Sequence, residues 1–260
     1  IEKAIKTGLA LNFTINKHSV FERKNYFYPD LPQGYQISQF EFPILSEGYL
    51  DIDQSDGSTK KIRIERAHLE QDAGKSIHDI DPKFSFIDLN RVGTPLLEIV
   101  SYPDLSSAND VVNYMSSLRQ TLMYIDVCDG NMQEGSLRAD VNLSVRKPGG
   151  ELGTRCEIKN LNSFKFIRQA IEFEFQRQIE VLEAGESVEQ NTMLFDTSTG
   201  ETRPMRSKEF SHDYRYFPDP DLLPVNLTNE QINQIKPSME ELPQEKMNRY
   251  INEYKFDKDI

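Results

Sequence analysis

An alternation of apolar and polar side chains marks residues 137–145. Five apolar residues occupy every second position there, and the polar residues between them include Arg138, Asp140 and Asn142. Successive side chains of a strand point to opposite faces, so this segment predicts a β-strand with one apolar face. The other face gathers short donors and acceptors, which suggests contact with a ligand or a metal ion. A solvated outer face of a sheet explains the same pattern equally well.

Two segments show helical spacing of apolar residues instead. From Ser107 to about residue 124 apolar residues recur every three or four positions, and Ser107 with Asp110 forms a start that resembles a capping box. Ser163 caps a second predicted helix, which runs to about residue 184, where Gly185 is placed to end it. We expect this helix to bury a stripe of apolar side chains: Phe164, Ile167, Ile171, Phe175 and Leu182.

Short strands are predicted around these helices, at 35–40, 49–53, 60–66, 84–90, 95–102, 136–146 and 154–160. Asp56-Gly57 in QSDGST indicates a hairpin turn, and KPGGELG (147–153) joins the last two strands in a second hairpin. Hairpins interleaved with long helices predict an α+β fold with a mixed or antiparallel sheet. We expect one domain over residues 1–227, opening with a helix at 1–12, and the start of a helical module at 228–260.

Composition narrows the range of functions. The net charge of −12 argues against a broad nucleic-acid-binding surface, but it leaves room for local contact with RNA. No apolar run approaches the length of a membrane span, and no signal-peptide pattern opens the chain. The two cysteines, Cys128 and Cys156, are too few for a disulfide framework. These features predict a cytoplasmic protein without membrane contact.

Several familiar sites are missing from the sequence. AGKS at 73–76 resembles the end of a phosphate-binding loop, but that loop requires a glycine where Leu69 stands. The sequence has no glycine-rich dinucleotide fingerprint, no cysteine pair at zinc spacing and no nucleophile elbow. We therefore expect both cysteines to be structural, and the chemistry to depend on acids and cations.

Three carboxylates on predicted strands are the main candidates: Glu70, Asp140 and Glu157. The hairpin 136–160 can bring the last two onto neighbouring strands, where they repel each other unless a cation lies between them. Oxygen-rich sites of this kind suit Mg²⁺. Cations are candidates to face a transferring phosphate: Lys75, Arg91, Arg138 and Lys159. Ion pairs between strands are an equally good explanation, and His68 is more simply a hydrogen-bonded histidine than a ligand.

At six places the chain resembles the GatB family, one of the components of the tRNA-dependent amidotransferases. The similar segments follow the family's order along nearly the whole chain: RKNYFYPDLPQGYQISQ (23–39), HLEQDAGKS (68–76), DLNRVGTPLLEIVSYPD (88–104), QEGSLRADVNLSV (133–145), EIKNLNSF (157–164) and DYRYFPDPDLLP (213–224). The archaeal paralogue GatE shares parts of these motifs. The resemblance implies the family's catalytic cradle domain.

The resemblance also implies an activity. Such enzymes convert Glu-tRNA(Gln), and in many bacteria Asp-tRNA(Asn), to the amidated form as carbon–nitrogen ligases with glutamine as nitrogen donor. GatB uses ATP and Mg²⁺ to turn the side-chain carboxylate into an acyl phosphate. Ammonia released by the amidase subunit GatA displaces the phosphate, and a small subunit, GatC, completes the complex. The resemblance implies a cytoplasmic enzyme, or one of an organellar matrix.

The family's metal ligands match this chain unevenly. The motifs align the family's acids with Glu70, Asp140 and Glu157, but the second acid of the first motif is Gln71 here. An amide oxygen can still bind a metal ion but brings no charge. Lys24 is a candidate for lining the ammonia path. The family's N-terminal strand and its C-terminal tRNA-binding domains are not found in the sequence, so we expect a fragment that does not make acyl phosphate alone.

Two other interpretations compete with the ligase. A scaffold derived from the same fold would position GatA and tRNA without catalysis, and Gln71 is the feature that favours it. A metal-dependent phosphohydrolase unrelated to tRNA fits the acids but not the six motifs. The resemblance does not distinguish Glu-tRNA from Asp-tRNA as substrate.

Overall fold

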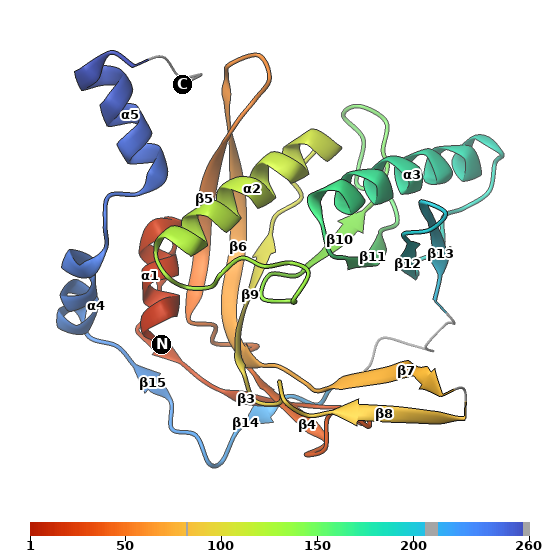
Figure 1. The fold of residues 1–260 in the computed structure, drawn as a ribbon, viewed down its shortest axis with the longest axis horizontal. Coiled ribbons are helices and arrows are strands. Elements are labelled where there is room, and N and C mark those ends of the chain that lie inside the picture. Colours follow the sequence, from red (N-terminus) through yellow and green to blue (C-terminus); the bar gives the residue numbers. More distant parts are fainter. Residues whose placement is uncertain (82, 206–212, 257–260) are drawn as a thin grey trace. The chain divides into compact units, whose positions relative to one another are not determined.

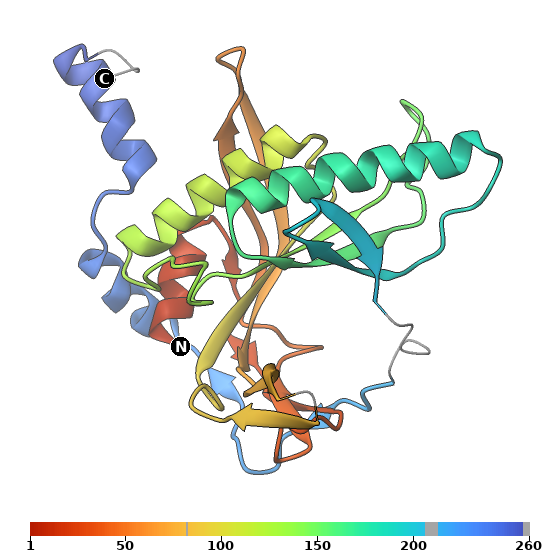
Figure 2. The ribbon, with the colours of Figure 1, turned by 45° about the vertical axis from the view of Figure 1, so that its right-hand side comes forward.

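The structure is a computed structural model that describes residues 1–81, 83–205 and 213–256. The chain divides into two compact units. Unit 1 combines the ranges 1–50, 61–104 and 212–260, and unit 2 combines 51–60 and 105–211. Figures 1 and 2 show the elements of both units in two orientations. Each unit is described by itself below.

The longest strands form a sheet in the order β1-β5-β6-β9. Its strands are β1 (Thr14–Ile15), β5 (Leu45–Asp53), β6 (Thr59–Gln71) and β9 (Pro95–Ser101). The turn between β5 and β6 has the conformation expected from its sequence: Gly57 has a φ of 81°, and the Gln54 amide donates to the Ser58 carbonyl at 2.8 Å. Ile62, Ile64 and Ala67 of β6 are fully buried, so apolar burial holds this strand in place.

Smaller sheets complete unit 1. One has the order β14-β3-β4, from β14 (Phe217–Pro218), β3 (Glu22–Asn25) and β4 (Tyr35–Ser38). β15 (Val225–Asn226) pairs with β2 (His18–Ser19), and β7 (Lys75–Asp81) pairs with β8 (Phe84–Asp88). The helices of unit 1 are α1 (Glu2–Ala10), α4 (Asn229–Ile235) and α5 (Pro243–Tyr254), with a 3-10 helix η1 (Lys236–Ser238). A capping box at Thr228 begins α4, which contacts α1.

Unit 2 consists of two long helices and a four-stranded sheet of order β10-β11-β12-β13. The strands are β10 (Ala139–Leu143), β11 (Cys156–Leu161), β12 (Thr192–Asp196) and β13 (Glu201–Pro204). β10 and β11 form the predicted antiparallel hairpin, and β11 pairs with β12 in parallel. The predicted helices are α2 (Ala108–Tyr124), capped by Ser107, and α3 (Phe164–Glu183), capped by Ser163.

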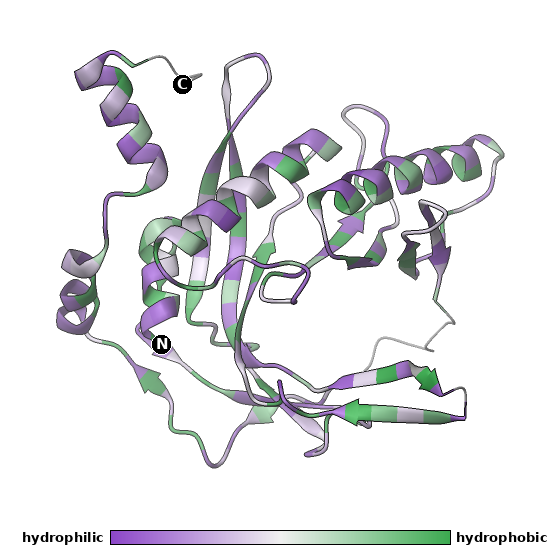
Figure 3. Ribbon diagram, in the orientation of Figure 1, coloured by the Kyte–Doolittle hydropathy of each residue, from purple (hydrophilic) through white to green (hydrophobic). Residues whose placement is uncertain are grey.

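The predicted buried stripe of α3 is wrong in its second half. Phe175 and Leu182 are 50% and 46% exposed, whereas Glu174 and Gln178 are fully buried. Polar and apolar residues mix along the helix (Figure 3). The Glu174 carboxylate accepts hydrogen bonds from Arg177, Gln178 and Thr202 at 2.6–2.9 Å. A buried carboxylate is tolerated when such donors surround it, so polar partners select this face of the helix.

The α+β class with antiparallel and mixed sheets is confirmed. Helices follow residue 228 as expected, while the domain boundary placed there stays a prediction. Within the described ranges, no helix combines the length and the apolar character that crossing a bilayer requires.

Candidate active site

Unit 1 contains a cluster of three side chains that we call the histidine–carboxylate cluster: His68, Glu70 and Glu98. His68 and Glu70 are two positions apart on β6, so they share one face of the strand. β9 runs antiparallel to β6 and sets Glu98 directly opposite His68. Register and alternation together therefore bring one imidazole and two carboxylates onto the same face of a sheet.

The imidazole lies between the two carboxylates. His68 Nε2 is 3.7 Å from Glu70 Oε2 and 3.4 Å from Glu98 Oε2. The side chains of His68 and Glu70 are 8% and 12% exposed. Burial disfavours the charged imidazolium, but the hydrogen bonds to Glu70 and Glu98 outweigh it and raise the pKa of His68. The hydrogen bond with His68 lowers the pKa of Glu98 in turn, against the effect of burial.

This cluster has the donors to hold a divalent cation. One ligand atom from each residue lies within 4.8 Å of the others. Carboxylate oxygens suit Mg²⁺, and an added imidazole nitrogen widens the choice to transition metals. The second ring nitrogen, His68 Nδ1, is buried and has no hydrogen-bond partner among the described residues. A buried unpaired nitrogen marks a place that a water molecule or a ligand would complete.

Aromatic side chains and one lysine lie near the cluster within unit 1. Lys24 Nζ lies 4.8 Å from the centre of the Tyr214 ring and 5.7 Å from that of Tyr26. The charge of Lys24 contributes to the lowered pKa of Glu98, so the ammonium is within electrostatic reach of the cluster. Burial, with the Glu70 charge adding to it, raises the pKa of Tyr26 to about 12. Burial and Glu70 raise the pKa of Tyr216 as well, so both phenols are neutral donors at neutral pH.

The loop that follows Glu70 is tightly constrained. Asp72 is buried and binds Arg91, with Nη2 to Oδ2 at 2.9 Å. Gly74 donates its amide to the Asp30 carbonyl at 2.8 Å, and a Cβ at Gly74 would lie 2.7 Å from a backbone oxygen of Asp88. Glycine is therefore required for this close approach.

The predicted residues of this loop have different neighbours. Lys75 is exposed at the start of β7, opposite Asp88. Arg91 pairs with Asp72. Gln71 ends β6, on the opposite face from Glu70 by strand alternation, and its Nε2 is buried without a partner in the described chain. The roles of Gln71, Lys75 and Arg91 stay predictions.

Unit 2 contains a second cluster, the lysine–carboxylate cluster of Asp140, Glu157 and Lys159. Lys159 Nζ lies 2.7 Å from Asp140 Oδ2 and 3.2 Å from Glu157 Oε1. Glu157 pairs directly with Asn142, and a register shift between Ala139 and Val141 sets Asp140 within reach of the lysine. The hairpin thus brings the two predicted acids together with a cation between them.

Electrostatics stabilise this arrangement. Burial disfavours the charged ammonium, but the hydrogen bond to Asp140 and the charges of both acids raise the pKa of Lys159. Thr192 of the adjacent β12 donates to Glu157 at 3.4 Å. Arg138 precedes β10 and is exposed. In this arrangement Lys159 occupies the position between the acids that a metal ion would take in the predicted site.

The structure thus brings some of the predicted residues together, while the predicted site as a whole draws residues from both units. Asp140, Glu157 and Lys159 belong to unit 2, whereas Glu70, Gln71, Lys75, Arg91 and Lys24 belong to unit 1. A single site containing Glu70, Asp140 and Glu157 stays a prediction. Sequence reasoning missed Glu98 as a site residue, although a lone carboxylate in the apolar run PLLEIV was a signal that could have drawn attention to it.

Comparison with known proteins agrees with the sequence motifs. A family model described as the GatB/GatE catalytic domain matches residues 1–233. Three similar curated proteins are each named as the B subunit of an aspartyl/glutamyl-tRNA(Asn/Gln) amidotransferase. That of Pelagibacter ubique is 58% identical over 98% of this chain and 52% of its own length. The Rickettsia bellii protein is 57% identical over 100% of this chain and 54% of its own length. The Xanthobacter autotrophicus protein is 59% identical over 98% of this chain and 51% of its own length. The chain spans about half the length of these relatives.

Proposed function

Since this chain belongs to the GatB/GatE catalytic domain family, we propose that it is the carboxylate-activating part of a tRNA-dependent amidotransferase. Its substrate is the glutamate of Glu-tRNA(Gln), the aspartate of Asp-tRNA(Asn), or both. The observation that carries the proposal is the histidine–carboxylate cluster, which gathers three potential metal ligands within 4.8 Å beside the HLEQDAGKS motif.

The chemistry explains why such a site would be needed. A carboxylate has no usable leaving group, so ammonia cannot displace its oxygen directly. In the proposed first step a carboxylate oxygen attacks the γ-phosphorus of ATP, the bond to the bridging oxygen breaks and ADP leaves. Ammonia then attacks the acyl carbon, the bond to the phosphate oxygen breaks, and phosphate leaves while the nitrogen loses a proton. The first step needs positive charge around the phosphate rather than a protein nucleophile.

The residues of this chain would divide these tasks. Glu70, Asp140 and Glu157 are the proposed metal ligands, and the geometry of unit 1 adds His68 and Glu98 to the candidates. Gln71 is a proposed neutral fourth donor, but its side chain would have to turn from the opposite face of β6. A bound Mg²⁺ would neutralise phosphate charge.

The proposed phosphate-facing cations are Lys75, Arg91, Arg138 and Lys159. For two of them this role requires a change of partner, because Arg91 now binds Asp72 and Lys159 binds Asp140 and Glu157. Lys24, among aromatic rings and within electrostatic reach of Glu98, is a proposed guide for incoming ammonia.

The complete enzyme would need further proteins. Ammonia would come from glutamine through the amidase subunit GatA, with the small subunit GatC in the same complex, and the substrate would be a misacylated tRNA. We place the enzyme in the cytoplasm or an organellar matrix. The relatives are named as one subunit of an amidotransferase, which supports a multisubunit assembly.

The test uses the full-length protein in its complex. Asp140→Asn keeps the size of the side chain but removes the charge that pairs with Lys159. We expect amidation to fall by at least about 10- to 100-fold, the loss typical when only a hydrogen-bonded partner of a metal ligand is changed, while tRNA binding is kept. Asp51→Asn, an exposed aspartate of unit 2, is the matched control and should leave amidation unchanged.

A scaffold function is the second candidate. Lys159 already pairs with both acids of its cluster, and Gln71 replaces an acid of the family motif. A protein that only positions tRNA and the amidase needs no free carboxylates. Under this alternative the Asp140→Asn complex would amidate at the rate of the unchanged enzyme.

A further inference from the structure

Helix α2 presents a surface without acidic side chains, in a chain whose net charge is −12. Asp110 and Arg119 are the only aspartate, glutamate, lysine or arginine residues between Ala108 and Tyr124. Asp110 is buried and binds Lys60 at 2.6 Å, so Arg119 is the charge that the surface of α2 presents. The rest of this surface consists of neutral side chains, among them Ser116, Gln120 and Met123.

Arg119 is held in place from one side. Its Nε donates to the carbonyl oxygen of Gly130 at 2.7 Å. Gly130 has a φ of 67°, and a Cβ there would lie 2.7 Å from the sulfur of Met123 and 2.9 Å from Nε of Arg119. A glycine is therefore required for the arginine to approach this closely.

The terminal nitrogens of Arg119 remain available. Among the described residues, the Arg119 side chain makes no hydrogen bond other than the one to Gly130. The charge of Arg119 contributes to the lowered pKa of Asp129, but one oxygen of the Asp129 carboxylate already accepts a hydrogen bond from the backbone amide of Asn131 at 2.8 Å. Holding Nε fixes the guanidinium plane while both NH₂ groups can still donate.

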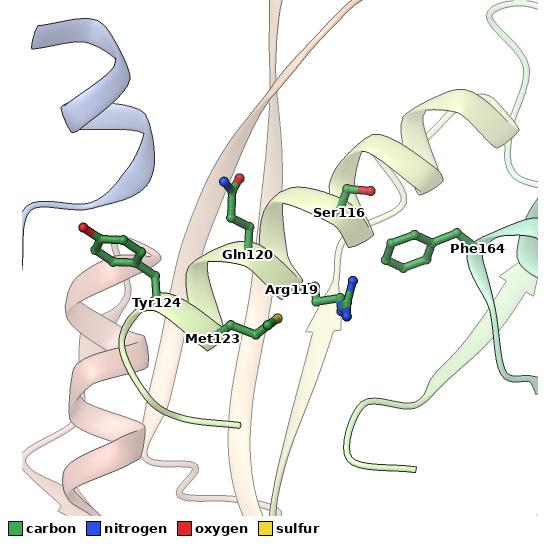
Figure 4. A pocket seen from close by; sticks show the side chains of 6 residues that line it. All are labelled: Ser116, Arg119, Gln120, Met123, Tyr124 and Phe164. Carbon is green, nitrogen blue, oxygen red and sulfur yellow. The ribbon is translucent and has the colours of Figure 1, made fainter. Parts of the chain in front are cut away.

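A pocket of about 460 Å³ opens beside this arginine. Its lining comes from α2 and from the first residue of α3: Ser116, Arg119, Gln120, Met123, Tyr124 and Phe164. In Figure 4 the Arg119 side chain extends toward the ring of Phe164, and the Ser116 hydroxyl points to the same side. The pocket therefore combines an aromatic ring, a guanidinium and neutral hydrogen-bonding groups.

The chemistry of this pocket favours an anionic, planar ligand. Proteins recognise unpaired RNA bases by stacking them on aromatic rings or on arginine and by hydrogen bonds to the base edges. Phe164 stands at the positive N-terminal end of the twenty-residue helix α3, next to the exposed Lys165, which adds attraction for a phosphate. A volume of about 460 Å³ also lies in the range of small-ligand pockets.

We propose that this pocket binds an unpaired nucleotide of the tRNA substrate, with the base on Phe164 and Arg119 as donor to the base edge or phosphate. The proposal rests on the proposed function, because that function makes a tRNA the substrate. It assigns RNA contact to a local patch of a chain whose net charge is −12.

The test measures binding of uncharged tRNA to the complete complex at fixed salt. We expect Arg119→Gln and Phe164→Leu each to raise the dissociation constant by about tenfold. Phe164→Tyr, which keeps the aromatic ring, should bind tRNA with the dissociation constant of the unchanged complex. Arg119→Gln should also lower the salt dependence of binding by about one counterion, which a purely structural change would not do. Thermal unfolding and recovery of the intact complex are recorded for every variant.

Matched controls come from the same unit. Arg203→Gln removes an exposed arginine of β13, and Phe175→Leu removes an exposed ring of α3; neither should change tRNA binding. The proposal is overturned if Arg119→Gln and Phe164→Leu bind tRNA as the unchanged complex does. It is also overturned if they lose another protein of the complex instead, since the pocket would then be a protein contact. Failure of the unchanged complex to amidate tRNA would contradict the proposed function separately.

Discussion

Replacing Glu174 by leucine tests whether a buried polar network holds the sheet that carries Glu157 and Lys159. The Glu174 carboxylate is fully buried and accepts four hydrogen bonds at 2.6–2.9 Å, two of them from Arg177. Thr202 on β13 would lose its acceptor, whereas Gln178 would keep a bond to the Leu143 carbonyl at 3.2 Å. The network therefore joins α3 to strands at both ends of the sheet.

The expected cost follows from these partners. Removing one member of a buried ion pair costs about 3–5 kcal/mol, and an unpaired buried hydroxyl costs about 1–3 kcal/mol. The Arg177 side chain is 31% exposed and can turn to water, so we expect the lower end, about 3 kcal/mol of unfolding free energy. With a urea slope of about 2 kcal/mol per molar, the midpoint would fall by about 1.5 M.

Urea unfolding followed by circular dichroism measures this change. The control is Glu172→Leu, an exposed glutamate of the same helix, which should change the unfolding free energy by less than about 0.5 kcal/mol. A loss below about 1 kcal/mol in Glu174→Leu would show that the network does not hold the sheet, because the buried donors would then have found other partners at little cost.

Three further outcomes follow from the structure. Burial raises the pKa of Asp110, but hydrogen bonds from Lys60 and Ser106 outweigh it and lower the pKa to about 2. Asp110 therefore contributes about 2 kcal/mol of stability, which is present above pH 4 and lost as the pH falls toward 2. The free energy of unfolding of Asp110→Asn, measured over the same pH range, should lack this dependence. Glu98→Gln should lower the pKa of His68, measured by NMR titration, because one of two acceptors that raise it loses its charge; an unchanged pKa would contradict the cluster geometry. Gly74→Ala should lower the melting temperature, because its Cβ would meet two backbone oxygens at 2.7 and 3.0 Å; an unchanged melting temperature would show that the loop adapts.

Local signals predicted much of the fold. The caps Ser107 and Ser163, and the glycines at positions 57 and 185, act within a few residues, so the sequence around them is sufficient to place helix starts, a helix end and a turn. The pairing of β11 with β12 joins residues more than 30 positions apart, and no local pattern specifies it. The buried face of α3 was mispredicted for the same reason, since the partner Thr202 of Glu174 lies on a distant strand.

In the candidate site, too, contacts within one hairpin could be predicted from the sequence, whereas contacts between strands far apart in the sequence could not. Alternation along one hairpin was sufficient to predict that Asp140 and Glu157 lie on neighbouring strands, but the position of Lys159 between them was not predicted. Glu98 joins His68 and Glu70 only through the register of β6 with β9, about thirty residues away, which sequence spacing does not show. A metal site and ion pairing between strands both require these acids on neighbouring strands, so the sequence pattern alone does not distinguish the two interpretations.

The proposed function places this chain in the part of the enzyme that activates a side-chain carboxylate by phosphoryl transfer. Hydroxylamine can trap the intermediate: the full-length complex is given ATP and Glu-tRNA(Gln) without glutamine, and the side-chain acyl phosphate is captured as the γ-hydroxamate. This product is separated from the α-hydroxamate that hydroxylamine forms by cleaving the ester bond of the aminoacyl-tRNA. We expect γ-hydroxamate with the unchanged complex and about 10- to 100-fold less of it with Glu70→Gln, at equal tRNA binding. Glu41→Gln, which changes an exposed acid of unit 1, should match the unchanged complex. Equal γ-hydroxamate with and without Glu70, or none from a complex that still amidates its tRNA, would contradict the proposed activation.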